Sequence, residues 1–422
     1  MTERTPAQLP PESSATTATT ATGHPGPSTT GTPVSTTASG RLIVALVLGQ
    51  LGMHSAMAGL RLAAPLQALS EGYSAWAVGL LLALFAAAPV LMALHAGRLA
   101  DRHGYHRPMR GAVALTLSAM LLALLSAFVP EPWAFVLLCG AAAGTGMGTN
   151  TGMLTIQRTA GHAAAGPTER VRIFSWLGVA PSFSNVVGPV AAGLMIDWAG
   201  FAAAYALLLS LPLITLVMAR QVPRQPARQG EAREDRASWD LLRLPGFRRL
   251  LLVNGLLAMC WDVHTFAVPV LGHERGFSAG TIGLILGTFT AAVTAVRLLI
   301  PVLAHRLRAT AVVRGAMLGC GAVFLLYPLA PSPGWMALGA VGLGLALGSV
   351  QPMVMSLLHE VTPDARHGEA LALRSMIINA SSTLLPLLFG ASGALVGASV
   401  LFWAAGVAVG SGSVLARKLQ PP

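Results

Sequence analysis

The chain has 422 residues, of which 54% are hydrophobic and only 10% are charged, and its mean hydropathy is +0.65. A water-soluble fold of this length cannot bury so much apolar surface, so the composition excludes a soluble globular protein and indicates a membrane protein. The net charge of +11 does not indicate a nucleic-acid partner, because the arginines fall in alternate loops and form no single basic face.

Residues 1–40 are rich in Thr, Ser, Ala, Pro and Gly and contain almost no large apolar side chains. Such a segment cannot bury a core, so we expect a disordered tail. Apolar stretches follow, each long enough to cross a hydrocarbon layer of about 30 Å as a helix. We count twelve, at approximately 42–68, 76–98, 109–130, 133–157, 173–197, 200–220, 249–271, 279–303, 311–330, 334–358, 368–393 and 396–416.

These stretches predict an all-α membrane protein in which two six-helix bundles, 41–220 and 248–418, are joined by a loop at 221–247. The arginines and the single lysine of the connecting segments gather on one side: they follow spans two, four, eight and ten, fill the central loop and close the chain. The opposite loops hold essentially Arg275 alone. By the positive-inside rule, we expect both termini, the tail and the central loop to be cytoplasmic, in the cytoplasmic membrane.

The first span carries polar side chains on one face. Gln50, His54, Ala58 and Arg61 recur at helical spacing and form a single stripe. Because ionisable groups within spans are costly and mark functional sites by default, we predict that Gln50, His54 and Arg61 line a central path. Two alternatives stay open, namely that His54 is a hydrogen-bonded core histidine and that Arg61 reaches toward the outer interface.

The loop after the second span reads GRLADRHGYHRP, and its Gly97, Asp101, Arg102, Gly104 and Arg107 stand at the spacing of a known pattern. This pattern resembles the signature loop of the major facilitator superfamily. The resemblance covers the whole set of spans and implies a twelve-helix fold in which this loop helps to hold the cytoplasmic gate shut. Independently of the family, a carboxylate such as Asp101 can face a helix N-terminus, and the arginines can donate charge-assisted hydrogen bonds. The alternative is a basic loop that only sets topology.

The fifth span contains FSWLGVAPSFSNVVGPVAAGLM, in which Ser184, Gly188, Pro189 and Gly193 resemble a motif of the drug and metabolite antiporter branch of that family. Only the Gly188-Pro189 pair and Gly193 match it outright, and an ordinary proline-kinked helix is the alternative. The fourth span lacks the buried arginine that the family carries there. Asn150 of that span is a weaker candidate for the central path.

The second half repeats the first. Residues 276–306 align without a gap onto residues 72–102 at an offset of 204, and 13 of the 31 positions are identical. Two similar halves in a membrane protein indicate a transporter whose binding site lies between them.

At the same offset, the positions equivalent to the polar stripe of the first span are Asn254, Ala258, Asp262 and Thr265 in the seventh span. Asp262 lies near the middle of the bilayer and is the predicted proton site. Burial there opposes the charged carboxylate, whereas Arg61 or His54 across the path would favour it. A permanent ion pair between the halves is the alternative.

Three more side chains are candidates for the wall of the path. Trp261 stands beside Asp262 and can supply an aromatic surface, although aromatic residues also serve packing. Arg297 replaces Ala93 of the first half, so the repeat marks it as an added charge that can meet an anionic substrate group or pair near the cytoplasmic gate. The amide Gln351 of the tenth span is a weaker candidate for the wall of the path.

No phosphate-binding loop, nucleophile elbow or metal-ligand spacing occurs in the sequence, and Cys139, Cys260 and Cys320 fit packing positions within spans. The sequence therefore predicts a protein that is not an enzyme, has no catalytic residues, cofactor or metal, and works as a monomer on a small molecule, with protons as a second partner.

The leading hypothesis is a secondary transporter working by alternating access, a proton-coupled exporter of drug-like or metabolite molecules with a mostly apolar cavity. One alternative is an uptake symporter for a small organic anion, with Arg61 or Arg297 at its carboxylate. A third hypothesis, of another class, is a transporter-like sensor or interaction protein that moves nothing and docks through its tail.

Overall fold

The computed structural model describes residues 36–163, 167–223, 239–303, 308–362, 367–417 and 419. Most of the predicted tail at 1–40 and of the predicted central loop at 221–247 lies outside these residues. The described residues form eleven α-helices with short 3-10 turns and contain no strand. A helix satisfies its backbone hydrogen bonds within one segment, which is what an apolar sequence in lipid requires.

The described residues of the first half form five helices: α1 (Thr36–Ser70), α2 (Ala75–His103), α3 (His106–Ser126), α4 (Trp133–Ala163) and α5 (Pro167–Ala219). The second half begins with the 3-10 turn η1 (Trp239–Arg243) and continues with α6 (Pro245–Glu274), α7 (Ala279–Leu303), α8 (Ala309–Leu326), the turn η3 (Tyr327–Leu329), α9 (Pro333–Val361), α10 (His367–Val396) and α11 (Ala398–Arg417).

Eight helices of the described chain are long and apolar enough to cross a membrane, namely α1, α3, α5, α6, α7, α8, α9 and α11. The predicted count of twelve spanning helices is therefore not confirmed. Two of the predicted spans, 173–197 and 200–220, fall together in α5, whose 53 residues are interrupted by a non-helical backbone at Gly200 (φ 81°, ψ −179°). Only glycine adopts such a conformation without strain.

The sequence repeat is present in the backbone. α2 begins at Ala75 and α7 at Ala279, which are 204 positions apart. In the turns before them, Gly72 (φ 86°) and Gly276 (φ 70°) both have positive φ values. Tyr73 N–H donates to the Ala68 carbonyl at 2.9 Å, and the equivalent Phe277 N–H donates to Gly272 at 2.9 Å. These bonds end α1 and α6 with the same glycine C-terminal motif.

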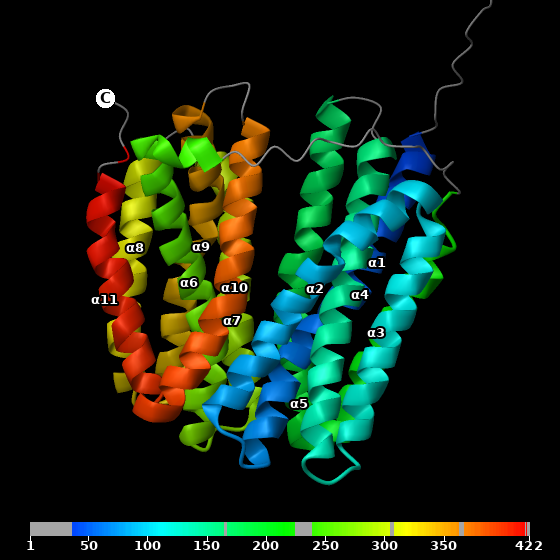
Figure 1. Cartoon of the computed structure of the whole chain (residues 1–422), viewed down its shortest axis with the longest axis horizontal. Helices are drawn as coiled ribbons and strands as arrows, with labels where there is room; N and C mark the ends of the chain where they lie inside the picture. The colour runs from blue at the N-terminus through cyan, green and yellow to red at the C-terminus, as the bar shows by residue number, and fades with distance from the viewer. Residues whose placement is uncertain are drawn as a thin grey trace, which may run out of the picture.

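The two halves stand side by side, and each packs mainly within itself (Figure 1). α1 begins and α11 ends at the upper end of this view, where the two groups of helices lie farther apart than at the lower end. The main contacts between the halves are made by α5 with α7 and by α2 with α10. One apolar core continues across both halves and includes Leu60 and Phe85 of the first and Phe266 and Phe289 of the second.

Glycine allows the halves to approach with backbone against backbone. A Cβ added to Gly79 on α2 would collide with the backbone carbonyl of Pro386 on α10, and a Cβ added to Gly283 on α7 would collide with that of Pro189 on α5. Gly79 and Gly283 are equivalent in the repeat. Small residues at helix interfaces permit such close packing in membranes. The contact of α2 with α10 is therefore equivalent to the contact of α7 with α5, because each joins an equivalent glycine to the carbonyl of a proline in the other half.

Candidate functional site

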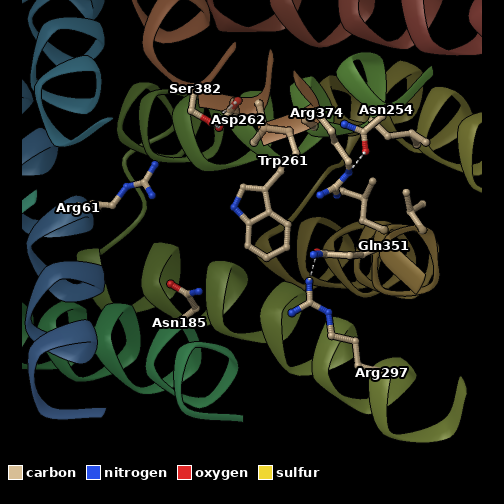
Figure 2. Close-up of a pocket in the computed structure, with 14 residues that line it drawn as sticks. Arg61, Asn185, Asn254, Trp261, Asp262, Arg297, Gln351, Arg374 and Ser382 are labelled. Carbon is tan, nitrogen blue, oxygen red and sulfur yellow. Dashed lines mark hydrogen bonds between the residues drawn. The ribbon is translucent and has the colours of Figure 1, made fainter. Parts of the chain in front are cut away.

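A cavity of about 340 Å³ lies between the halves (Figure 2). Residues of α1 and α5 from the first half and of α6, α7, α9 and α10 from the second half line it. Its polar residues are Arg61, Asn185, Asn254, Asp262, Arg297, Gln351, Arg374 and Ser382. Its other lining residues are Leu257, Ala258, Trp261, Leu347, Val350 and Ile378. Among the described residues, this cavity holds three guanidinium groups and one carboxylate, so it is more polar than the mostly apolar cavity that the sequence led us to expect.

Asp262 is the acidic residue of the cavity. Its side chain is 5% exposed, and Ser382 Oγ on α10 lies 3.3 Å from both carboxylate oxygens, so it donates to this carboxylate. The positive charge of Arg61 on α1 acts on the same carboxylate from the other half. The structure thus brings the predicted residues Arg61 and Asp262 into one electrostatic environment, as the positions of their helices in the repeat predicted.

Two further arginines are held by neutral groups. Arg297 NH1 donates to Ser182 Oγ at 3.4 Å, and its NH2 donates to Gln351 Oε1 at 3.5 Å. Arg374 Nε donates to Asn254 Oδ1 at 3.3 Å. Within the described residues, neither guanidinium forms an ion pair with a carboxylate. Hydroxyl and amide oxygens orient a guanidinium without cancelling its charge, so both arginines keep a full positive charge beside the cavity.

Trp261 lies in the centre of the close-up and marks the boundary of a second cavity (Figure 2). That cavity has a volume of about 50 Å³ and lies among α1, α2, α5, α6 and α7. Arg61, Asn185 and Trp261 line both cavities. The Trp261 ring contacts Phe289 with centroids 4.7 Å apart. These three side chains therefore form a partition between the larger and the smaller cavity.

Three predicted residues of the central path do not line either cavity: Gln50, His54 and Asn150. Gln50 is 5% exposed, and its Oε1 has no hydrogen-bond partner among the described residues. His54 Nδ1 likewise has no hydrogen-bond partner among the described residues. Of the stripe predicted on the first span, Arg61 reaches both cavities and Ala58 reaches the smaller one.

The predicted gate motif is only partly described. Gly97, Asp101 and Arg102 lie in α2, in a stretch where the structure describes the backbone and not the side chains. Gly104 follows with a φ of 66°, which turns the chain from α2 into α3, and Arg107 is exposed. The role of this loop in a gate stays a prediction.

The antiporter-like residues lie where α5 packs on α1 and α7. Ser184 Oγ donates to the Leu51 carbonyl on α1 at 3.3 Å. A Cβ on Gly188 would stand 2.6 Å from the Ser55 carbonyl oxygen, so only glycine fits there. Pro189 and Gly193 face the beginning of α7, where a Cβ added to Gly193 would likewise collide with the backbone carbonyl of Ala279. Close packing accounts for the small residues of this motif.

Asn185, Arg374 and Ser382 also line the cavity but are not among the candidates predicted from the sequence. Arg374 lies in α10, within the span expected at 368–393. Serines are too common in membrane helices to stand out, so Ser382 gave no signal. Among the described residues, no group of three His, Cys, Asp or Glu side chains could hold a metal ion.

Residues 46–261 and 250–422 each match a family model described as Major Facilitator Superfamily. The fold is similar to a crystal structure of a mutant of the nucleoside transporter NupG, with a TM-score of 0.70 at 12% identity, covering 90% of this chain and 100% of that one. It is also similar to a bacterial homologue of the iron transporter ferroportin in an inward-facing state, with a TM-score of 0.71 at 18% identity and coverage of 90% and 98%.

A third similar structure is a POT family transporter in complex with 5-aminolevulinic acid, with a TM-score of 0.67 at 14% identity and coverage of 90% and 96%. At these identities the likeness concerns the fold.

Proposed function

The chain belongs to the Major Facilitator Superfamily, and from that premise we propose that this transporter carries a small organic anion together with a proton through the cavity between its halves. The observation that carries the proposal is the charge of the cavity wall, where the described residues include three arginines and one aspartate. An uncompensated guanidinium within a membrane is costly. An anionic substrate offsets that cost, whereas a neutral apolar drug does not.

We assign the proton to Asp262. Its carboxylate is buried, accepts a hydrogen bond from the Ser382 hydroxyl and lies under the influence of the positive charge of Arg61. A substrate anion in the cavity adds negative charge beside the Asp262 carboxylate, and a buried carboxylate next to another negative charge takes up a proton more readily. Anion and proton then bind together, which is the requirement for symport. Driven by an inward proton gradient, such a carrier works in uptake.

The two halves supply the movement. Parallel repeats around a central site work by rocking against each other. Gly79 and Gly283 each pack against the carbonyl of a proline in the other half, so both halves contribute an equivalent contact around which they can rotate. In the proposed topology, the beginning of α1 and the end of α11 face the cytoplasm, and the protein resides in the cytoplasmic membrane as a monomer. The contacts of α2 and α7 then close the outer side.

Proton-coupled export of drug-like or metabolite molecules is the second candidate. It rests on the resemblance of the fifth span to the antiporter motif, which Gly188, Pro189 and Gly193 match outright. In that mechanism substrate and proton compete for the cavity and do not bind together. The two candidates therefore predict opposite directions of proton movement when substrate enters.

The test uses the full chain in proteoliposomes that enclose a pH-sensitive dye. Organic acids and amphipathic cationic drugs are added outside in separate runs, to the wild type, to Asp262→Asn and to the control Glu131→Gln, whose exposed carboxylate lies between α3 and α4. Acidification of the lumen with an acid, absent in Asp262→Asn and retained in Glu131→Gln, supports anion symport.

Proton release from the lumen with a drug supports export. If Asp262→Asn transports acid and protons as the wild type does, the assignment of the proton to Asp262 is wrong. If no compound moves protons and no labelled acid accumulates, a sensor or interaction protein is the better hypothesis.

A further inference from the structure

The cavity holds two guanidinium groups in equivalent settings. Arg297 on α7 is oriented by Gln351 of α9, and Arg374 on α10 is oriented by Asn254 of α6. All four residues belong to the second half and all four line the same cavity. In Figure 2 the two pairs stand on different walls, with Trp261 near the centre of the view. Each pair consists of a cation and a neutral amide.

The amide partner matters because it fixes a guanidinium and leaves its charge available. A carboxylate partner would neutralise the arginine and use the donors that an anion needs. Asn254 offers a further donor: its side chain is 4% exposed, and its Nδ2 has no hydrogen-bond partner among the described residues. An acid group held by Arg374 would supply the missing acceptor. This unpaired donor is independent of the arginine geometry and points to the same ligand chemistry.

The third arginine of the cavity, Arg61, comes from the other half, and its positive charge acts on the Asp262 carboxylate. When the charges of Arg61 and Asp262 are counted against each other, two positive charges remain among the described residues of the cavity wall, those of Arg297 and Arg374. A substrate with one acid group leaves one of them uncompensated, whereas a substrate with two acid groups compensates both.

We infer that the substrate is a dianion with an acid group at each end, one bound at Arg297 and Gln351 and the other at Arg374 and Asn254. This inference rests on the proposed anion transport and narrows its substrate. The cavity of about 340 Å³ is small for a ligand pocket, which suits a dicarboxylate of about four to six carbons. Leu347, Val350 and Ile378 line the same cavity and give the carbon chain an apolar contact.

The repeat shows that the first half has no equivalent of the Arg297 guanidinium. Arg297 corresponds to Ala93 in the first half, and Asn254 corresponds to Gln50, which does not line the cavity. The dianion is thus held by one half, while the other half contributes Arg61 and Asn185. Substrate bound in this way stays with the second half as the two halves move.

The experiment measures binding to the purified full chain in detergent by titration calorimetry, with succinate, butyrate and glycerol phosphate as probes. Succinate and butyrate have the same number of carbons and differ in one acid group. The variants are Arg297→Gln, Arg374→Gln and Arg374→Lys, and the matched control is Arg314→Gln, an exposed arginine of α8 outside the cavity. Thermal unfolding of each variant shows that it is folded.

We expect the wild type and Arg314→Gln to bind succinate about tenfold or more tightly than butyrate, because a second hydrogen-bonded charge pair forms. Each Arg→Gln variant should lose most of this preference and bind the two acids within about threefold. Arg374→Lys should keep part of it, because it keeps the charge without the geometry of the guanidinium.

Equal binding of succinate and butyrate by the wild type overturns the inference, and so does a full preference for succinate in both Arg→Gln variants. Tighter binding of glycerol phosphate than of succinate overturns it as well, because that ligand carries its charges at one end. A wild type that binds and transports butyrate as well as succinate refutes the dianion and leaves the proposed function intact. A wild type that binds none of the probes and transports no organic acid refutes the proposed function itself.

Discussion

The carboxylate of Asp197 accepts a hydrogen bond of 2.8 Å from the backbone N–H of Gly280 and thereby ties α5 to the first turn of α7 in the other half. A helix N-terminus carries unsatisfied N–H groups and a partial positive charge, so a carboxylate is a favourable partner there. The bond lies beside the close approach of Gly193 to Ala279. Asp197 therefore stabilises the conformation in which this end of the molecule is closed.

Asp197→Ala should favour opening at this end. A charge-assisted bond at a partly exposed helix N-terminus contributes about 1 kcal/mol, which corresponds to a shift of roughly fivefold in the equilibrium between closed and open forms. The measurement is the labelling rate of a cysteine placed at Thr265, which lines the smaller cavity, by a thiol reagent that cannot cross the membrane. Cys139, Cys260 and Cys320 are replaced by alanine in this background.

Glu131→Gln provides the control, because Glu131 is an exposed carboxylate between α3 and α4. Labelling in this variant should match the parent. An unchanged rate in Asp197→Ala would show that the bond does not set the equilibrium.

The repeated contact between the halves predicts matching effects at Gly79 and Gly283. Gly79→Val and Gly283→Val each place side-chain atoms where a proline carbonyl of the other half lies, and overpacking of this kind costs about 1–3 kcal/mol. Both variants should slow transport about tenfold or more, to a similar extent, because each one prevents closure at the same end. Initial rates of uptake in proteoliposomes check this.

Gly111→Ala is the comparison for these two variants, since a Cβ at Gly111 meets nothing within 4 Å. It should transport at the wild-type rate. A normal rate in either valine variant would mean that the close approach is not needed for the transport cycle.

The repeat allowed much of the fold to be predicted from the sequence. Its offset of 204 places equivalent glycines at 72 and 276, and the structure has the same turn at both. A backbone turn depends on a few neighbouring residues, so a local pattern suffices to predict it. The spans expected at 173–197 and 200–220 meet at Gly200, where the backbone of α5 is interrupted, but no connecting loop separates them.

The candidate site was predicted in part. The stripe on the seventh span gave Asn254 and Asp262, and both line the cavity. The equivalent stripe on the first span gave Gln50 and His54, which do not, because helical spacing defines a face and leaves open how far each helix is rotated against its neighbours. Arg374 escaped prediction for a related reason: only the packing of α10 against α6 brings it to Asn254.

A buried network in the first half predicts two different stability effects. Tyr205 donates to Gln67 Oε1 at 2.7 Å, and Ser126 Oγ donates to the same oxygen at 3.2 Å. Tyr205→Phe should cost about 1 kcal/mol, because Gln67 keeps its bond to Ser126. Gln67→Leu should cost about 2–3 kcal/mol, because it leaves the buried hydroxyl of Tyr205 without a partner. Thermal unfolding in detergent distinguishes these outcomes, and an equal loss in both variants would contradict the account.

Trp261 separates the two cavities, so its size should control passage between them. Trp261→Ala joins the cavity of about 340 Å³ to the one of about 50 Å³ and removes the ring contact with Phe289 at 4.7 Å between centroids. Proteoliposomes with this variant should lose an imposed pH gradient several-fold faster than the wild type in the absence of substrate, because water and ions reach the contact of α2, α5 and α7.

Trp261→Phe tests whether the bulk of the ring is the cause. A phenyl ring retains an aromatic contact with Phe289 and most of the partition, so its gradient should decay nearly as slowly as that of the wild type. Trp198→Ala serves as the control, because that side chain is 82% exposed and lies outside both cavities. Equal decay in Trp261→Ala and Trp198→Ala would place the barrier elsewhere, with the backbone contacts at Gly79 and Gly283 as its remaining source.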